Sequence, residues 1–307
     1  MRHDDTSLLD ELRGLRWPAR RVAAATLPGA HRARLRSPGG ELSEYRAYRQ
    51  GDDPRRLDWR LLARSDRAFI RLADDHALLP TVLVVDASAS MAFPADGGTR
   101  HRKWRLARAV ALGLAAVAHA AGDPVGLAIG VPNDVGRGAG DRWLPPRARR
   151  GVVGELARAL DAVTPEGDAP LAPLATHAAA ARGTRLVLVS DFLGDAEATL
   201  RAATAHRALG GEVYAVHVLD ALELDPPRGT LLATDPERPE VRRPLDAASR
   251  AAYLAAFGEW RGATARAWRD AGATYAAVTT DEAPARAVRR IVRGAPDEER
   301  RVARADA

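Results

Sequence analysis

The chain has 307 residues, of which 46% are hydrophobic, and its formal net charge is +6. A chain of this length can form about two domains, or one large α/β domain with an appendage, and can bury a substantial core. It has no cysteine, which excludes disulfides, thiolate nucleophiles and thiolate metal sites and fits a reducing compartment. Lys103 is its only lysine. Because arginine and alanine are so abundant, the basic charge is poor support for nucleic-acid binding.

No stretch of the sequence reaches the ~18 uncharged apolar residues that a membrane-spanning helix needs. The most apolar candidate, residues 107–121, is too short and contains Arg108 and His119. The first residues, "MRHDDTSLLDELRGLRWPARR", are charged and lack the apolar core of a signal peptide. We therefore expect a soluble, cytoplasmic protein with no transmembrane segment.

Residues 1–78 form a predicted amino-terminal extension that is rich in arginine and turn residues. Ser7 is expected to cap a short helix. Asp53 is expected to cap a second helix, with Pro54 at its first position. The segment "RAFIRLA" (67–73) is typical of a strand. The extension is therefore expected to contain short helices and at least one strand.

Apolar strands alternate with amphipathic helices from residue 79 to residue 293. Strands are expected at 78–86, 123–130, 185–191, 212–220 and 273–280, and helices at 102–121, 151–163, 171–182, 196–209 and 247–271. This alternation predicts an α/β fold with a doubly wound, mostly parallel sheet that is covered on both faces. Residues 141–145 are expected to add a strand, residues 229–244 a small hairpin insertion, and residues 294–307 a disordered tail.

The stretch "LVVDASASM" ends a buried strand with a carboxylate and two hydroxyls at alternate positions, Asp86, Ser88 and Ser90. Asp191 follows the strand "RLVLVS" in a similar way. Because ligands gather at the carboxyl ends of the strands in an open α/β sheet, we expect Asp86 and Asp191 to meet at one edge. The loop "TPEGDAPL" (164–171) could supply a third segment to the same place.

The residues alone leave two interpretations of this oxygen cluster open. Carboxylates and hydroxyls suit Mg²⁺ or Mn²⁺, and the histidines show no spacing typical of zinc ligands. Alternatively, Ser88 or Ser90 caps the next helix while Asp86 and Asp191 accept loop hydrogen bonds, and short motifs of this kind recur by chance. The second aspartate after a second buried strand favours the metal.

Two groups of motifs resemble known families. "VVDASASM", "DPVGLAIG" and "LVSDF" resemble the von Willebrand factor A fold with its metal-ion-dependent adhesion site. "YRAYRQGDDPRRLDWRLLARSDRAFIRLADD" resembles the signature of the bacterial family known as domain of unknown function 58, whose members carry such an A-type domain. The resemblance implies that Ser88 and Ser90 bind the ion directly and that Asp86 binds it directly or through water. Asp191 is implied to be the carboxylate of the third loop.

Asp168 is the point at which the sequence departs from this resemblance. The second loop of such sites usually has a threonine, where this chain has "PEGDAPLAPLA". With Asp86, Asp168 and Asp191 all ionised, a divalent ion no longer leaves the site positively charged, which weakens the capture of a partner's carboxylate. Either Asp168 strengthens metal binding at the expense of partner binding, or it points away from the ion as the cap of helix 171–182.

The expected function is that of a non-enzymatic, metal-dependent interaction or adaptor protein. The resemblance implies a MoxR-type AAA+ ATPase as partner, in chaperone-like maturation of a client protein. Because the sequence has no G-x-x-x-x-G-K-[ST] motif, nucleotide hydrolysis is expected to come from that partner.

The sequence offers two alternative functions from other classes of protein. A Mg²⁺-dependent phosphohydrolase could use Asp86 as its nucleophile, but the second aspartate that haloacid-dehalogenase-type phosphatases place two residues later is missing. A nucleic-acid-binding protein could use the arginines of residues 31–36 and 55–64, but acidic residues are interleaved with them. We therefore expect neither catalysis nor nucleic-acid binding.

Overall fold

The structure is a computed structural model of the whole chain. The residues it describes are 3–19, 33–36, 42–48, 57–65, 67–72, 78–94, 101–131, 143–180, 183–229, 231–234 and 240–294. The predicted tail after residue 294 and the predicted cap Asp53 lie outside these residues.

The chain divides into two compact units, one formed by Met1–Arg21 with Leu79–Ala307 and the other by Val22–Leu78. The predicted extension, residues 1–78, is therefore not one piece. Its first helix, α1 (His3–Glu11), belongs to the larger unit, because Leu8, Leu12 and Trp17 are buried in that unit's core. The chain therefore passes between the two units twice, after residue 21 and before residue 79, whereas the sequence predicts a single boundary after residue 78.

A six-stranded sheet forms the centre of the larger unit. Its strands, in spatial order, are β11 (Thr274–Thr279), β8 (Glu212–Leu219), β7 (Arg185–Ser190), β4 (Thr81–Asp86), β5 (Val125–Gly130) and β6 (Trp143–Arg147). The first five strands run parallel to one another, and β6 pairs antiparallel with β5. The predicted α/β fold with a mostly parallel sheet is confirmed.

The central strands are apolar along their whole length because both of their faces are covered. Every residue of β4, β5, β7 and β8 is buried. On such strands, successive side chains point into two different cores, so the sequence shows a continuous apolar run and not an alternation.

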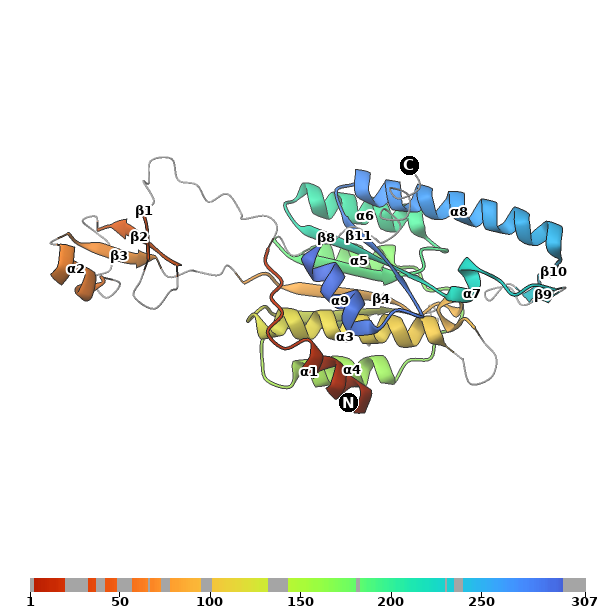
Figure 1. Cartoon of the computed structure of the whole chain (residues 1–307), viewed down its shortest axis with the longest axis horizontal. Coiled ribbons are helices and arrows are strands. Elements are labelled where there is room, and N and C mark those ends of the chain that lie inside the picture. The colour runs from red at the N-terminus through yellow and green to blue at the C-terminus, as the bar shows by residue number, and fades with distance from the viewer. Residues whose placement is uncertain are drawn as a thin grey trace. The chain divides into compact units, whose positions relative to one another are not determined.

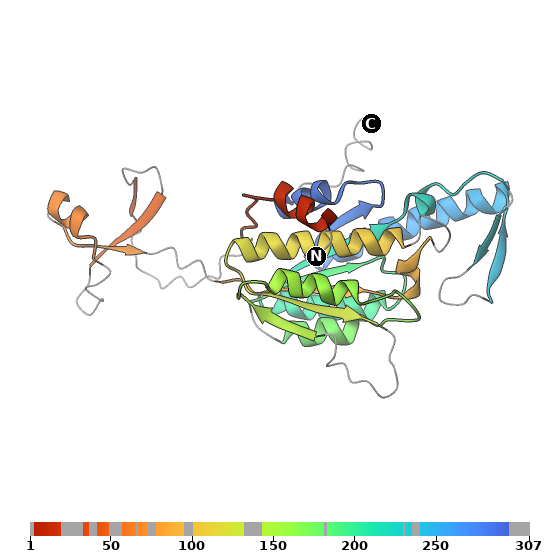
Figure 2. The ribbon, with the colours of Figure 1, turned by 90° about the horizontal axis from the view of Figure 1, so that it is seen from below.

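Helices cover both faces of the sheet (Figures 1 and 2). One core lies under α1, α3 (Arg102–Ala120), α4 (Val152–Asp161) and α9 (Pro284–Arg293). The other core lies under α5 (Ala172–Ala179), α6 (Ala196–Ala208) and α8 (Ala247–Asp270). The buried helix α3 contacts β4, β5, β7 and β8, so its first turn reaches the middle of the sheet.

We call the loops that follow β4, β7 and β8 the carboxyl edge of the sheet. Asp86 is the last residue of β4 and Asp191 is the first residue after β7, and these two strands are parallel neighbours. The predicted meeting of Asp86 and Asp191 at one edge is confirmed. The short helix α7 (Ala221–Leu224) follows β8 at the same edge, and the predicted insertion forms the hairpin β9 (Leu231–Thr234) and β10 (Arg242–Leu245).

The described residues of the smaller unit form a three-stranded antiparallel sheet and one helix. Its elements are β1 (Ala33–Arg36), β2 (Leu42–Ala47), α2 (Trp59–Ser65) and β3 (Phe69–Leu72). The strand predicted within residues 67–73 is therefore present. Helix α2 begins later than predicted, and the Asp58 carboxylate accepts a hydrogen bond of 3.0 Å from the Leu61 N–H, as a capping residue does.

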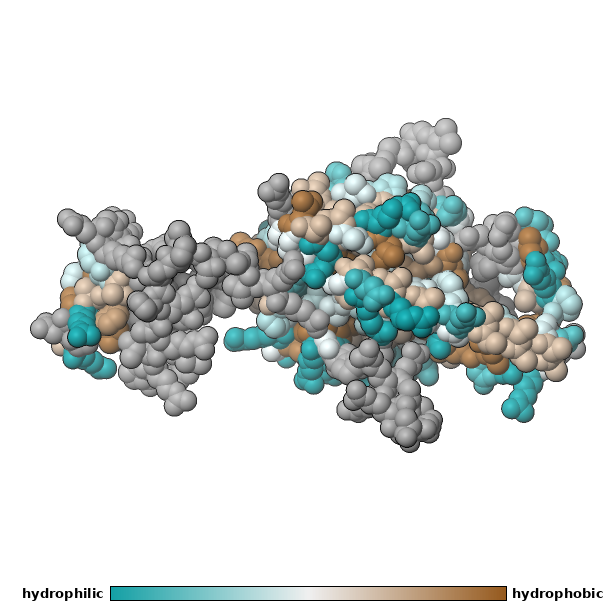
Figure 3. All heavy atoms as spheres, turned by 90° about the horizontal axis from the view of Figure 1, so that it is seen from above, coloured by the Kyte–Doolittle hydropathy of each residue, from teal (hydrophilic) through white to brown (hydrophobic). Residues whose placement is uncertain are grey.

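Ser7 lies inside α1 and does not cap it as predicted. Among the described residues, no helix is long and apolar enough to cross a membrane. On the face that Figure 3 shows, the coloured residues are a mixture of hydrophilic and hydrophobic side chains.

Candidate metal centre

Asp86 is fixed at the carboxyl edge by hydrogen bonds to both of its carboxylate oxygens. Its Oδ1 accepts a bond of 2.8 Å from the Ser88 N–H, and its Oδ2 accepts a bond of 2.5 Å from the Ser190 hydroxyl. Asp86, Ser88 and Ser190 are all buried. Because each carboxylate oxygen has a second lone pair, Asp86 can still accept a cation or a water.

Ser88 and Ser90 place two hydroxyl oxygens 3.0 Å apart. The two hydroxyls hydrogen-bond to each other, so one of them donates its single proton to the other. The Ser88 hydroxyl is also a hydrogen-bonding neighbour of Asp86, and the Ser90 hydroxyl is one of Asp191. A hydroxyl that donates to a carboxylate keeps its lone pairs for a cation. Ser88 is the residue before a short 3₁₀ helix, Ala89–Ala92, but its side chain makes no capping bond. The alternative that these serines serve as helix caps is therefore not what the structure shows.

Asp191 forms a buried ion pair with Lys103 of α3. The Lys103 ammonium lies 2.6 Å from Asp191 Oδ2 and 2.8 Å from Glu223 Oε1 of α7. The Lys103 side chain has no exposed surface, and that of Asp191 is 2% exposed. The other oxygen of Asp191 accepts a bond of 3.2 Å from the Leu193 N–H.

These contacts shift the pKa values of the buried groups in opposite directions. Burial, and next the negative charge of Asp191, raise the pKa of Asp86 to about 7. Burial alone would raise the pKa of Asp191, but the adjacent Lys103 ammonium outweighs it and holds that pKa below its usual value. Burial would lower the pKa of Lys103, but Asp191 and Glu223 raise it, so Lys103 stays charged. Asp191 is thus the more strongly ionised of the two aspartates.

Asp168 lies on the loop that approaches Asp86 and the two serines. Two backbone hydrogen bonds tie this loop to the residues after β4, from the Ala89 N–H to the Gly167 carbonyl (2.8 Å) and from the Glu166 N–H to the Ala87 carbonyl (3.0 Å). Asp168 is exposed. It does not cap α5, which begins after Leu171, so its predicted structural role is not observed.

A small hollow of about 10 Å³ opens between these loops, and its lining includes Asp86, Ser88, Asp168, Ser190 and Asp195. This is about the space that one water molecule or ion occupies. Asp195, at the start of α6, was not among the predicted residues. Its only sequence signal is that it follows Asp191 closely in "SDFLGDAEA".

The structure does not gather all the predicted carboxylates around one point. Among the described residues, no three acidic, histidine or cysteine side chains are close enough together to hold a metal. Asp86, Ser88 and Asp168 share the hollow, whereas Asp191 faces Lys103. The sequence analysis also missed Ser190, Lys103, which pairs with Asp191, and Glu223, which pairs with Lys103. These residues come from separate elements that only the fold brings together.

The hydroxyl pair nevertheless fits a small divalent ion. Mg²⁺ binds oxygen ligands in an octahedron at about 2.0–2.1 Å, which places adjacent ligands roughly 2.9 Å apart. The Ser88 and Ser90 oxygens are 3.0 Å apart, and Ser88 lines the water-sized hollow together with the carboxylate of Asp86. The donor set of hydroxyl and carboxylate oxygens is of the kind that Mg²⁺ and Mn²⁺ prefer.

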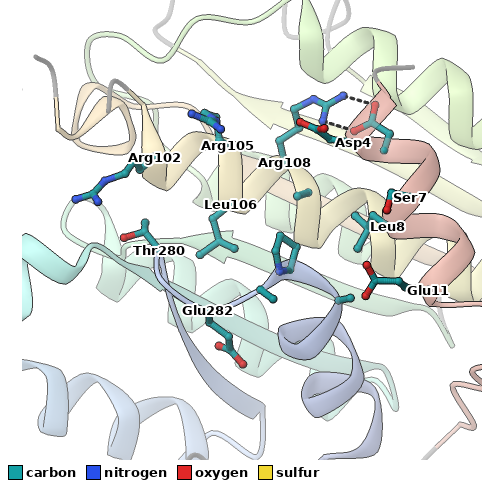
Figure 4. A pocket seen from close by; sticks show the side chains of 15 residues that line it. Asp4, Ser7, Leu8, Glu11, Arg102, Arg105, Leu106, Arg108, Thr280 and Glu282 are labelled. Carbon is teal, nitrogen blue, oxygen red and sulfur yellow. Dashed lines mark hydrogen bonds and ion pairs between the residues drawn. The ribbon is translucent and has the colours of Figure 1, made fainter. Parts of the chain in front are cut away.

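A second and larger hollow, of about 470 Å³, lies between α1, α3 and α9. Figure 4 shows Arg102, Arg105 and Arg108 along α3, with Ser7 and Glu11 of α1 across the hollow. Arg108 makes a two-pronged ion pair with Asp5 and also bonds to Asp161, so this arginine joins α1 to α3.

Two solved structures are similar to this chain over most of their own length. Among solved structures, conserved hypothetical protein BatB from Bacteroides thetaiotaomicron is 14% identical, covers 70% of this chain and 97% of its own, and has a TM-score of 0.41. An aerotolerance-related membrane protein from Bacteroides fragilis is 15% identical, covers 70% and 98%, and has a TM-score of 0.43.

Sequence relatives place the chain more firmly. Uncharacterized protein Rv1480 of Mycobacterium tuberculosis is 32% identical over 295 residues, which are 91% of this chain and 86% of that protein. Uncharacterized protein Mb1516 of Mycobacterium bovis gives the same values. The family model described as "Protein of unknown function DUF58" matches residues 44–261. The chain therefore belongs to the DUF58 family.

Proposed function

We propose that this DUF58 protein is a non-enzymatic adaptor that binds a partner protein through a divalent metal ion. The single observation that carries the proposal is the pair of serine hydroxyls, 3.0 Å apart, of which Ser88 lines a water-sized hollow together with the buried Asp86. Mg²⁺ or Mn²⁺ would be held by Ser88 and Ser90, with Asp86 and Asp168 directly or through water. The von Willebrand factor A-like resemblance of the motifs supports the same site.

The bound ion would supply a coordination position for an aspartate or glutamate of the partner. The chain's own residues prepare that position. Ser190 and the Ser88 N–H orient Asp86, and Asp86 and Asp191 orient the two serine hydroxyls. Because the groups are already hydrogen-bonded and buried, little ordering is needed when the ion binds, and pre-organisation of this kind favours affinity.

The proposed partner is a MoxR-type AAA+ ATPase, with which the adaptor would mature an unknown client protein. This part of the proposal rests on the family resemblance of the motifs. It is supported by the absence of a G-x-x-x-x-G-K-[ST] motif from the sequence, because an ATP-driven process would then need a separate ATPase.

The experiment is a calorimetric titration of Mg²⁺ into the wild type and the double variant Ser88→Ala/Ser90→Ala. We expect the double variant to lose at least about tenfold in Mg²⁺ affinity, since each hydroxyl supplies one ligand. Ser7→Ala is the matched control, because Ser7 is an exposed serine in α1 and should leave Mg²⁺ binding unchanged.

A second measurement tests the partner. Binding of the AAA+ ATPase encoded nearest to this gene is measured by surface plasmon resonance in Mg²⁺ and in EDTA, for the wild type and the double serine variant. Binding that needs both Mg²⁺ and the serines supports the proposal. Wild type that takes up no Mg²⁺, or a partner that binds equally well in EDTA, would overturn the metal-dependent mechanism.

A further inference from the structure

Lys103 is placed where a basic side chain is costly to bury. It is the only lysine among 46 basic residues of the chain, and it has no exposed surface. Its ammonium lies between Asp191 of the carboxyl edge and Glu223 of α7, at 2.6 and 2.8 Å. A buried charge of this kind is tolerated only where its partners surround it closely.

The chemistry of the position explains why it is not one more arginine. An ammonium group is compact and donates three hydrogen bonds that rotate freely, whereas a guanidinium is a broad plane with five fixed donors. The space between two carboxylates from different elements suits the smaller group. The neighbouring position on α3, Arg102, reaches outward instead and pairs with Asp220 while keeping 30% of its side chain exposed.

The ion pair with Lys103 limits which other groups the Asp191 carboxylate can bind. Its Oδ2 faces the Lys103 ammonium, its Oδ1 accepts the Leu193 N–H, and the carboxylate also accepts the Ser90 hydroxyl. A divalent ion at Oδ2 would lie against a second cation, and like charges at such distances repel strongly in a buried site. Asp191 is therefore free to orient Ser90 but is blocked by Lys103 from approaching the ion itself.

We propose that Lys103 is a positioning residue of the metal centre, which holds Asp191 as a hydrogen-bond acceptor for Ser90 and prevents it from becoming a metal ligand. This inference rests on the proposed function and specifies its ligand set. It also gives the site a built-in positive charge. That charge offsets one carboxylate and leaves the bound ion more attractive to a partner's carboxylate than the three aspartates alone would.

The test is a double-variant cycle on Mg²⁺ affinity with Lys103→Met and Asp191→Asn. Removing Lys103 alone should raise Mg²⁺ affinity about tenfold, because the freed carboxylate can turn to the ion. Asp191→Asn should cost about threefold when Lys103 is present but about thirtyfold in the Lys103→Met background, since residues in contact couple. A merely structural role for Lys103 predicts additive effects and no gain in affinity.

Arg102→Met is the matched control, because it removes the adjacent positive charge on α3 without touching Asp191. It should change Mg²⁺ affinity less than threefold, an effect expected of a partly exposed charge. If Lys103→Met does not fold, all four proteins of the cycle also carry Glu223→Gln. Lys103→Met then leaves only one buried carboxylate, that of Asp191, without its partner.

The outcomes separate this inference from the proposed function. Wild type that binds Mg²⁺ through its serines while the cycle is additive overturns the role of Lys103 and leaves the metal-dependent adaptor intact. If the wild type binds no Mg²⁺ but Lys103→Met does, the metal dependence of the natural protein is overturned. The same result supports the inference that Lys103 prevents Asp191 from becoming a metal ligand. Absence of Mg²⁺ binding in every variant overturns both.

Discussion

At the scale of single residues, burial and neighbouring charges give chemically similar groups different roles. Asp86 and Asp191 end adjacent strands, yet among the residues that the structure describes only Asp191 is paired with a cation. The pKa of Asp86 is accordingly raised and that of Asp191 lowered. Asp168 differs from both, because it is exposed on the rim of the hollow and water screens its charge.

The first prediction concerns Asp168, at the position where resembling sites have threonine. Asp168→Thr should lower Mg²⁺ affinity about three- to tenfold and raise affinity for the partner at saturating Mg²⁺, because the carboxylate attracts the ion and repels an incoming carboxylate. Calorimetric titration measures the first effect and surface plasmon resonance the second. Glu166→Gln is the control, since it removes the same charge from an exposed position of the same loop. Equal effects of the two substitutions would place Asp168 outside the site.

The second prediction concerns His217, which lies in β8 among the rings of Phe192, Trp260 and Tyr275. Burial lowers the pKa of His217 to about 3, and its Nδ1 lies 2.7 Å from the Tyr275 hydroxyl. The unfolded chain takes up a proton near pH 6.5 but the folded chain does not, so this contribution to stability is complete above about pH 6.5 and is lost as the pH falls toward 3. The loss should reach about 2 kcal/mol at pH 5.

Urea unfolding at pH 7.5 and pH 5 tests this pH dependence. His217→Gln should lose less stability than the wild type between the two pH values, by about 2 kcal/mol. Other titrating groups, including Asp86, are common to both proteins and cancel in the difference. His177→Gln, at an exposed position of α5, should keep the wild-type dependence. If His217→Gln lost as much stability as the wild type between pH 7.5 and pH 5, the neutral His217 would not be the source of this pH dependence.

At the scale of elements, short helices are attached to α3 by buried charge pairs as well as by apolar side chains. Helix α1 packs on α3 through Leu8 and Leu12 and is joined to it by the Asp5–Arg108 pair, with distances of 2.7 and 2.8 Å. Glu223 joins α7 to α3 through Lys103 in the same manner. Removing one partner of a buried pair leaves a charge without compensation, which costs far more than removing an exposed pair.

The third prediction compares two aspartates of α1. Asp5→Ala should lower the free energy of unfolding by about 3 kcal/mol, because Arg108 loses a buried two-pronged partner and keeps only Asp161. Asp10→Ala removes an exposed pair with Arg13 and should cost less than about 0.5 kcal/mol. Urea denaturation of both variants gives the two values. Similar losses would show that the Asp5–Arg108 pair does not hold α1 in place.

At the scale of the whole molecule, the larger unit is built from two separate parts of the chain. Arg185 at the start of β7 contacts both of them. Its side chain donates to the Trp17 carbonyl (3.2 Å) and its backbone N–H to the Pro80 carbonyl (2.8 Å). The two crossings into the smaller unit therefore leave the larger unit from neighbouring places, and residues 22–78 are an insertion in its chain path.

The fourth prediction follows from this chain path. A variant in which a ten-residue Gly/Ser linker replaces residues 22–78 should fold and melt within a few degrees of the larger unit in the full chain, because such a linker spans roughly 16–19 Å. Deletion of residues 1–78 should instead lower the melting temperature strongly, since Leu8, Leu12 and Trp17 each stabilise by about 1.5–3 kcal/mol when buried. Thermal denaturation followed by circular dichroism compares the two. A stable 79–307 fragment would contradict the assignment of α1 to the core.

The amino-acid sequence alone is enough to predict the α/β class, the order of the main strands and helices, the hairpin after β8, and the edge at which Asp86 and Asp191 meet. These features follow from local patterns, because buried parallel strands are apolar runs and their ends share one edge. The helix starts were less predictable: Ser7 is predicted as a cap but lies inside α1, and Asp58, which caps α2, is not predicted as one. Several residues can serve as caps, and packing selects among them.

Which charges face one another cannot be predicted without the three-dimensional structure. Lys103 and Asp191 are 88 residues apart in the chain and Lys103 and Glu223 are 120 apart, so no spacing in the sequence links them. The same holds for Ser190 and Asp86, which are 104 residues apart. Local sequence patterns indicate burial and periodicity. The charge of a site depends instead on how distant elements pack, and here that packing pairs Lys103 with Asp191.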